Sequence, residues 1–333
     1  MFPLSPSPPQ PLTPPPWRWL FPLLLGLLLT ACSRPQPVTL RVGPNAWLGY
    51  EPLYLARDLG LYGDRDIQLQ RFASATETMR AFSEKRIEAA ALTLDEALAL
   101  AQFEKDISIV LVFDFSHGAD ALLARPEIRS LDDLKGRSIG VESSAVGAYM
   151  LQRALDRAGL SEQEVKVVSI NVDGHEAAYT GGQVEAVITF EPIRSRLLAR
   201  GAKVLFDSSM IPGEIIDVLV VREACLRSHP ELVGHLLSGW FAALDELKVR
   251  PAAAAGRMRA SLGLTPEAIL QGFQGLRLPE RQENWELLLG SPPRLLGPAL
   301  RLEEVMLDKR LLYSRVEPHT MLDEASLARL YRP

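Results

Sequence analysis

The sequence predicts an α/β protein of two lobes, with mostly parallel sheets flanked by helices and a ligand cleft between the lobes. Segments with the alternating or continuous apolar pattern of strands are followed by segments with helical periodicity, which is typical of parallel sheets. This strand–helix series occurs twice in succession. At 333 residues the chain is also long enough for two domains, each with its own core.

The composition excludes several classes of protein. An apolar share of 47% and a charged share of 23% are ordinary for a globular protein. The net charge of −5 and the lack of any basic run argue against nucleic-acid binding. Two cysteines are too few for a disulfide framework.

The first residues have the pattern of an export signal. Arg18 is the one charged residue before the apolar run from Leu20 to Leu29, which is too short for a comfortable membrane span. Small residues follow this run, as they do before a signal cleavage point.

The cleavage point ends in a cysteine. Leu29-Thr30-Ala31-Cys32 resembles the bacterial lipobox, in which the cysteine is lipidated and becomes the mature N-terminus. We therefore predict a lipoprotein signal peptide over residues 1–31, lipidation at Cys32 and a linker over residues 32–37. The alternatives are a plain signal peptide with an incidental cysteine, and a start codon after Met1.

The stretch 38–63 opens the first series. Its residues 38–42 alternate as a strand does, Trp47 and Tyr50 lie in a turn, and Pro52 suits a first helical position. Ligands bind beyond the carboxyl ends of strands in open α/β sheets. The first series continues with strands at 67–72, 89–92 and 107–113, and with helices opened by the capping boxes Ser74–Glu77 and Thr93–Glu96.

The second series repeats the pattern. Its strands are predicted at 137–141, 165–170, 186–189 and 204–206, and its helices at 145–158, after a capping box Asp173–Glu176, and at 193–200. A third part holds a strand at 217–221 and a long amphipathic helix after Ser228. We therefore predict lobe 1 over residues 38–120, lobe 2 over 121–209, and a return to lobe 1 plus C-terminal helices over 210–333.

The turns between strands and helices are polar. Helix starts gather free N–H groups and partial positive charge, so together these turns could bind a polar ligand, although each Ser or Thr alone is explained as a helix cap. The turns contain acidic residues but no Lys or Arg. A strongly anionic ligand would lack its usual partner, so a neutral or amine-bearing ligand on Trp47 or Tyr50 fits better.

No catalytic pattern is found. The five histidines have no metal-ligand spacing, and there is no nucleophile elbow, phosphate loop or dinucleotide fingerprint. Cys225 has no histidine placed to activate it and is interpreted as a buried structural thiol. We predict no catalytic residue, no metal and no cofactor.

Three segments carry a family resemblance. They are 47–62 with Trp-Leu-Gly-Tyr-Glu-Pro-Leu-Tyr, 133–141 with Asp-Leu-Lys-Gly-Arg-Ser-Ile-Gly-Val, and 181–187 with Gly-Gly-Gln-Val-Glu-Ala-Val. Together they resemble the substrate-binding proteins of nitrate, sulfonate and taurine ABC importers and the related NMT1/THI5-like proteins for pyrimidine precursors. The resemblance covers residues 38 to about 221.

The resemblance implies a type II periplasmic-binding-protein fold whose lobes are joined by a two-segment hinge and close on a small solute. It implies a ligand site formed by Trp47, Tyr50, Ser74, Thr76, Thr93, Ser143, Ser144 and Glu191. The cysteine-rich stretch of the yeast pyrimidine-forming relatives is absent.

The resulting hypothesis is a monomeric, lipid-anchored receptor in the periplasm or at the cell surface. It would capture a nitrogen- or sulfur-containing solute, such as a pyrimidine precursor, an amine or a sulfonate, for an ABC permease and its ATPase. The alternatives are an enzyme on the same fold, resembling a pyrimidine synthase or a chorismate dehydratase, and an exported ligand sensor.

Overall fold

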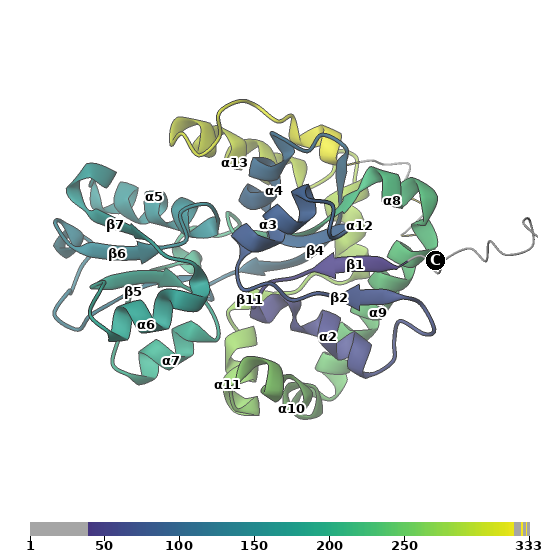
Figure 1. Cartoon of the computed structure of the whole chain (residues 1–333), viewed down its shortest axis with the longest axis horizontal. Helices are drawn as coiled ribbons and strands as arrows, with labels where there is room; N and C mark the ends of the chain where they lie inside the picture. Colours follow the sequence, from purple (N-terminus) through teal and green to yellow (C-terminus); the bar gives the residue numbers. More distant parts are fainter. Residues whose placement is uncertain (1–38, 323–327, 329–330, 332–333) are drawn as a thin grey trace, which may run out of the picture. The chain divides into compact units, whose positions relative to one another are not determined.

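Two separate β-sheets form the framework of the protein (Figure 1). The computed structural model describes residues 39–322, 328 and 331. The predicted signal peptide, Cys32 and the linker lie outside the described residues. The strand order is β11-β4-β10-β3-β1-β2 in the six-stranded sheet and β7-β6-β8-β5-β9 in the five-stranded sheet.

Most strands match the predicted segments, but β5 and β11 were not predicted and β2 ends at Leu69 rather than at residue 72. The six-stranded sheet contains β1 (Leu40–Gly43), β2 (Ile67–Leu69), β3 (Ala89–Thr93), β4 (Ile107–Ser116), β10 (Ile216–Arg222) and β11 (Leu276–Arg277). The five-stranded sheet contains β5 (Ala121–Ala124), β6 (Ser138–Val141), β7 (Lys166–Ser169), β8 (Ala186–Thr189) and β9 (Lys203–Asp207).

Both sheets are mixed rather than mostly parallel. β1 pairs in parallel with β2 and β3, and β6 with β7 and β8. The pairings of β10 and β5 are antiparallel. The reason is topological. β5 and β10 each begin just after the chain has crossed from the other sheet, so they run away from the junction. Their neighbouring strands run toward it.

Helices cover both faces of each sheet (Figure 1). The five-stranded sheet has α5 (Val146–Ala158) on one face and α6 (His175–Thr180) and α7 (Ile193–Ala199) on the other. The six-stranded sheet has α3 (Ala75–Ser83), α4 (Leu94–Ala101) and α13 (Leu296–Asp308) on one side, and α2 (Glu51–Asp58), α10 (Pro251–Leu262) and α11 (Pro266–Phe273) on the other. The described residues also form α8 (Glu223–Ser228), α9 (Pro230–Val249) and α12 (Arg281–Leu289). Short 3-10 turns occur at Leu48–Tyr50, Asp132–Leu134, Glu162–Glu164, Val172–Gly174, Ser208–Met210 and Pro318–Met321.

The helix starts match the sequence in part. Ser74 caps α3 by accepting the Glu77 N–H at 3.2 Å, and Glu96 Oε2 accepts the Thr93 N–H at 2.9 Å. The predicted capping box Asp173–Glu176 is wrong. A 3-10 turn occupies Val172–Gly174, so α6 begins at His175 with Gly174 as its cap.

The long amphipathic helix is confirmed as α9, and its aromatic residue Trp240 is fully buried. Trp240 packs edge-on against Phe113 at a centroid distance of 4.8 Å, and Phe113 packs against Tyr50 at 5.1 Å. Such aromatic packing is favourable beyond the burial of area. The row of rings therefore fixes Tyr50, in the turn after β1, to the core of the six-stranded sheet.

The chain crosses between the sheets twice, at residues 117–120 and 208–215. Ser208 joins the two crossings, because its hydroxyl lies 2.7 Å from Ser116 Oγ and accepts the Gly118 N–H at 2.7 Å. Two adjacent crossings are the arrangement expected of a hinge. The predicted lobe boundaries fall within or beside these crossings, and we keep that division as a proposal.

Candidate ligand-binding site

The turn between β1 and α2 directs two aromatic side chains to the junction of the lobes. Trp47 and Tyr50 are 4% and 2% exposed. Trp47 meets Phe190 of the other lobe edge-on, with ring centroids 5.3 Å apart. Trp47 Nε1 donates to Asp114 Oδ2 at 3.1 Å, and the Tyr50 hydroxyl donates to Asp217 Oδ1 at 2.5 Å. Each ring is thus held by a buried carboxylate.

Gly49, between the two aromatic residues, is required by this packing. A Cβ atom at this position would lie well inside van der Waals contact with Asp114 Oδ2 and Trp47 Nε1. Any side chain there would separate the indole from its carboxylate partner. The Trp-Leu-Gly-Tyr motif therefore encodes a close approach between the turn and β4.

A small central cavity lies between the two lobes. Its volume is about 20 Å³, room for the centre of about one water molecule. Lobe 1 and the first crossing contribute Asn45, Trp47, Tyr50, Ala75, Thr93, Glu96, Asp120 and Asp217, and lobe 2 contributes Glu142, Val146 and Phe190. Two larger cavities have volumes of about 590 Å³ and 670 Å³. The second of these shares Phe190 with the central cavity.

Carboxylates occupy the helix starts across the junction. Glu142 of lobe 2 accepts the Thr76 N–H at the start of α3, at 3.0 Å, and also the Thr76 hydroxyl. Glu96 of lobe 1 accepts the Val146 N–H at the start of α5, at 3.0 Å. Ser144 Oγ lies 2.7 Å from Thr76 Oγ1. At the starts of α3 and α5, the Thr76 and Val146 N–H groups are therefore bonded to carboxylates of the opposite lobe.

Three further carboxylates are buried at the junction. Asp217 on β10 lies directly opposite Asp114 on β4 in the antiparallel register, and Asp120 lies in the first crossing. Burial raises the pKa of Asp114 to about 7 and that of Asp120 to about 7. Burial and the facing Asp114 raise the pKa of Asp217 well above its usual range. Among the described residues, no Lys, Arg or His forms an ion pair with any of the three.

Glu96 belongs to the same acidic environment. Burial, and then the charge of Asp95, raise its pKa to about 8, although two backbone N–H groups donate to it. The junction therefore holds carboxyl groups whose ionisation is opposed by their surroundings. Perturbed carboxyl groups in a cleft are typical of functional sites.

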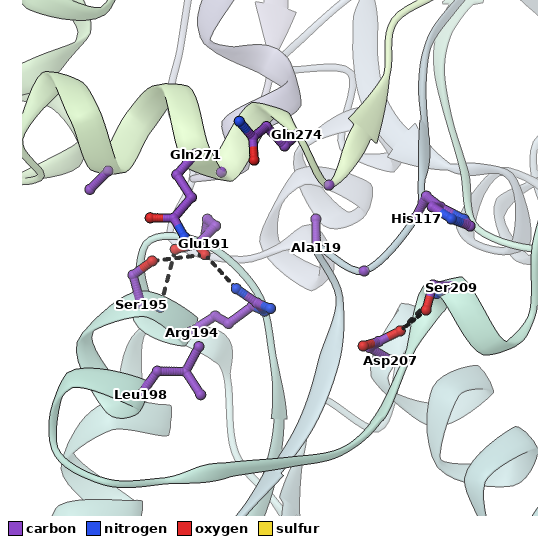
Figure 2. Close-up of a pocket in the computed structure, with 14 residues that line it drawn as sticks. His117, Ala119, Glu191, Arg194, Ser195, Leu198, Asp207, Ser209, Gln271 and Gln274 are labelled. Carbon is purple, nitrogen blue, oxygen red and sulfur yellow. Dashed lines mark hydrogen bonds and ion pairs between the residues drawn. The ribbon is translucent and has the colours of Figure 1, made fainter.

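Glu191 does not line the central cavity but lines both larger cavities, and the one of about 590 Å³ is drawn in Figure 2. It is 2% exposed and accepts hydrogen bonds from the Ser195 amide at 3.2 Å, the Ser195 hydroxyl at 2.9 Å and Arg194 Nη1 at 3.3 Å. Figure 2 shows Gln271 of α11 pointing toward it. The turn itself has no basic residue, but Arg194 follows within one helical turn.

The structure brings together some of the residues predicted from the sequence. Trp47, Tyr50 and Thr93 line the central cavity. Thr76 and Ser144 join the lobes, and buried Ser74 caps a helix. Ser143 is exposed and does not cap α5, which begins after Ala145. Their role in ligand binding stays a prediction.

Sequence reasoning missed Asp114, Asp120 and Asp217 as parts of the site. Asp114 and Asp217 lie in mostly apolar strands, Ile107–Ser116 and Ile216–Arg222. A carboxylate inside a fully buried strand needs a specific reason, because burying an unpaired charge is costly. The sequence therefore contained a signal for each of these two residues. It did not contain the strand register that places Asp114 opposite Asp217, about 100 residues later in the chain.

Family membership follows from a comparison with known sequences. The profile of the NMT1-like family matches residues 33–260, more than half of the chain. The chain belongs to the NMT1-like family. This confirms the family to which the three motifs pointed.

Individual relatives of this NMT1-like protein are distant. The taurine-binding periplasmic protein of Escherichia coli is 25% identical over 170 residues, which are 50% of this chain and 53% of the relative. The match thus spans about half the length of that relative. The alkanesulfonate-binding protein SsuA of Xanthomonas axonopodis pv. citri, solved with MOPS, has a TM-score of 0.71 at 18% identity and covers 86% of this chain and 98% of SsuA. The desulfurization enzyme DSZB has a TM-score of 0.64 at 19% identity, covering 88% and 98%. These likenesses confirm the two-lobed α/β fold of SsuA-like periplasmic binding proteins.

Proposed function

We propose that this NMT1-like protein is the solute-binding component of an ABC-type import system and that it captures a small organic solute between its lobes. The observation that carries the proposal is the central cavity, whose walls come from turns of both lobes. A ligand there contacts both lobes at once, so it favours their closure. The family and the taurine- and sulfonate-binding relatives support the same role.

Closure follows from the contacts at the junction. The two crossings form the hinge, and the Thr76–Glu142, Thr76–Ser144 and Val146–Glu96 hydrogen bonds close the cleft on its opposite walls. A solute of more than a few heavy atoms enters only after the lobes separate, because the cavity of about 20 Å³ is too small for it. The bound solute and the re-formed hydrogen bonds then hold the lobes together.

A thermal-shift screen of amines, pyrimidines, sulfonates and nitrate tests solute capture, because a bound solute raises the unfolding temperature by mass action. Closure is tested separately with cysteines at positions 76 and 144, whose native hydroxyls are 2.7 Å apart. The screened solute should speed formation of this disulfide, and the single-cysteine variants are the controls. A solute that binds without changing the rate would contradict closure.

The proposed setting is outside the cytoplasm. Cys32, when lipidated, would anchor a monomer to the membrane in the periplasm or at the cell surface, where it delivers solute to a permease and its ATPase. Within residues 39–322 no helix is long and apolar enough to cross a membrane. Cys32→Ser should release the protein from membranes in cell fractionation, and a protein that stays membrane-bound would contradict the lipid anchor.

A second candidate is an enzyme, because DSZB has the same fold. In the described part of the chain the one cysteine is Cys225, which is buried, and burial raises its pKa to about 11. It therefore stays a thiol at neutral pH and is a poor nucleophile. Chemical turnover of any solute found in the screen would overturn the binding role and favour the enzyme.

A further inference from the structure

We infer that the central site recognises a small organic cation with N–H donors, a protonated amine, amidine or guanidine, bound by Asp217 and Asp120 beside the rings of Trp47 and Phe190. The inference rests on the proposed solute-binding function and names the chemical class of the solute. It starts from the polar atoms that line the central cavity.

The lining presents hydrogen-bond acceptors that have no donor. Asn45 Oδ1, Asp120 Oδ2 and Asp217 Oδ2 are buried and unpartnered, in side chains that are 7%, 4% and 2% exposed. Buried acceptors without a donor are rare, because each loses its hydration without replacement. A ligand that brings several N–H groups would complete all three.

Two of these acceptors belong to carboxyl groups that no Lys, Arg or His in the described part of the chain pairs with. Directly opposite Asp217 in the sheet lies Asp114, whose Oδ1 also has no donor and whose Oδ2 accepts the Trp47 indole N–H. Arg194 acts on Asp120 only from a distance, since its ion pair is with Glu191. Like charges facing each other across strands destabilise a sheet. A cation between them removes that repulsion.

An anion is disfavoured at the same place. The helix starts that ordinarily receive anions, at Thr76 and Val146, are bonded to Glu142 and Glu96. Both carboxylates also line the central cavity. A sulfonate or nitrate there would therefore face the carboxylates of Glu142 and Glu96 rather than free N–H groups.

The aromatic residues suit a cation. Trp47 and Phe190 both line the cavity, and an aromatic face attracts a cation placed within about 6 Å of its centroid. The central volume of about 20 Å³ fits a single ammonium nitrogen, so an amidinium or guanidinium group is accommodated only when the lobes separate, and a larger body would extend toward the cavity of about 670 Å³ that shares Phe190. The charge of the lining thus favours a cation.

Matched probes test the charge of the ligand. Guanidinium is compared with neutral urea, benzamidinium with neutral benzamide, and both with methanesulfonate and benzenesulfonate, at millimolar concentration and constant ionic strength. Potassium chloride is the control for a monovalent cation that has no N–H group. We expect guanidinium or benzamidinium alone to raise the unfolding temperature and to bind in isothermal titration calorimetry.

Substitutions then locate the site. Asp217→Asn keeps an acceptor for the Tyr50 hydroxyl and removes the charge, so cation affinity should fall about tenfold to a hundredfold. The unfolding temperature without probe should not fall, because the variant loses a repulsion with Asp114. Asp120→Asn should weaken binding independently. Glu303→Gln is the control, since Glu303 is equally buried but lies outside the cavity lining, and it should leave cation affinity unchanged.

The outcomes separate this inference from the proposed function. Binding of a sulfonate or a neutral probe without any cation overturns the inference and leaves solute capture intact. Cation binding that Asp217→Asn and Asp120→Asn both leave unchanged also overturns it. Failure of every probe and of the wider solute screen would contradict both proposals.

Discussion

Two buried carboxylates of this protein have opposite surroundings. Glu303 on α13 is 1% exposed, accepts the Val316 N–H at 2.6 Å and pairs with Arg315 at 3.3 Å. Asp217 on β10 is 2% exposed, accepts one hydroxyl from Tyr50 and faces another carboxylate, Asp114. The comparison shows that a basic residue pairs with Glu303, whereas no basic residue in the described part of the chain pairs with Asp217.

Glu51 extends the comparison. This residue is 1% exposed, in the first turn of α2, and it receives Arg71 at 2.6 Å and the Ser261 hydroxyl at 2.9 Å. A buried charge is tolerated when it is paired and hydrogen-bonded. Asp114, Asp120 and Asp217 lack such partners among the described residues, so their burial destabilises the chain unless a ligand compensates it.

The largest expected effect is on the pH dependence of stability. The pKa values of Asp114 and Asp120, about 7, lie above the ordinary value of 3.8, so the folded chain holds more protons than the unfolded chain. The free energy of unfolding should therefore fall as the pH rises from about 4 to about 8, by an amount on the order of a few kcal/mol. Chemical denaturation at several pH values measures this change.

The double variant Asp114→Asn, Asp217→Asn should flatten that slope. Burial lowers the pKa of His175 to about 4, so this group adds a slope of opposite sign only below about pH 6.5. The comparison of variant with wild type is therefore most direct from pH 6.5 to 8. A free energy of unfolding that stays constant or rises over this range in the wild type would contradict the claim that these carboxylates lack a compensating charge.

A second prediction compares substitutions of opposite sign. Glu303→Gln removes the charge that Arg315 and the Val316 N–H both meet, and it should lower the free energy of unfolding by about 1–3 kcal/mol. Asp217→Asn should leave that energy unchanged or raise it at pH 8. If both variants lowered the free energy of urea unfolding equally, the proposed difference between the surroundings of Glu303 and Asp217 would be wrong.

Gly49→Ala should disturb the junction by steric overlap. The added Cβ would collide with Asp114 and the Trp47 indole nitrogen, at an expected cost of about 1–3 kcal/mol in stability. The indole fluorescence should change as well, because Trp47 loses its carboxylate partner. Gly256→Ala is a matched control, since a Cβ there meets no atom within 4 Å. Equal stability of the two variants would argue against the close approach at Gly49.

The smallest effect is expected at the exposed serines after β6. Ser144→Ala removes a hydrogen bond to Thr76 across the junction and should reduce closure by about 0.5–1.5 kcal/mol, measured as weaker binding of the screened solute. Ser143→Ala is the control, because Ser143 is exposed and makes no such contact. A larger effect of Ser143→Ala than of Ser144→Ala would contradict the contribution of the Ser144–Thr76 hydrogen bond to closure.

The sequence predicts local features of this protein better than the contents of its site. Alternation, caps and Pro52 located the turn of Trp47 and the cap at Ser74, because those signals depend on residues a few positions apart. The pairing of Asp114 with Asp217, and that of Thr76 with Glu142, depends on strand register and on how two lobes meet. Neither is encoded in a local pattern, and the acidic residues that line the central cavity, Glu96, Asp120, Glu142 and Asp217, are not the acidic turn residues on which the preference for a cation was based.

The most direct test of the central claim counts protons released when a cation binds. Titration calorimetry of benzamidinium at pH 7, repeated in buffers of different ionisation enthalpy, gives this number. The bound cation should lower the pKa values of Asp114 and Asp120 from about 7, so net proton release is predicted. Binding without proton release, or with proton uptake, would contradict a site of uncompensated carboxylates.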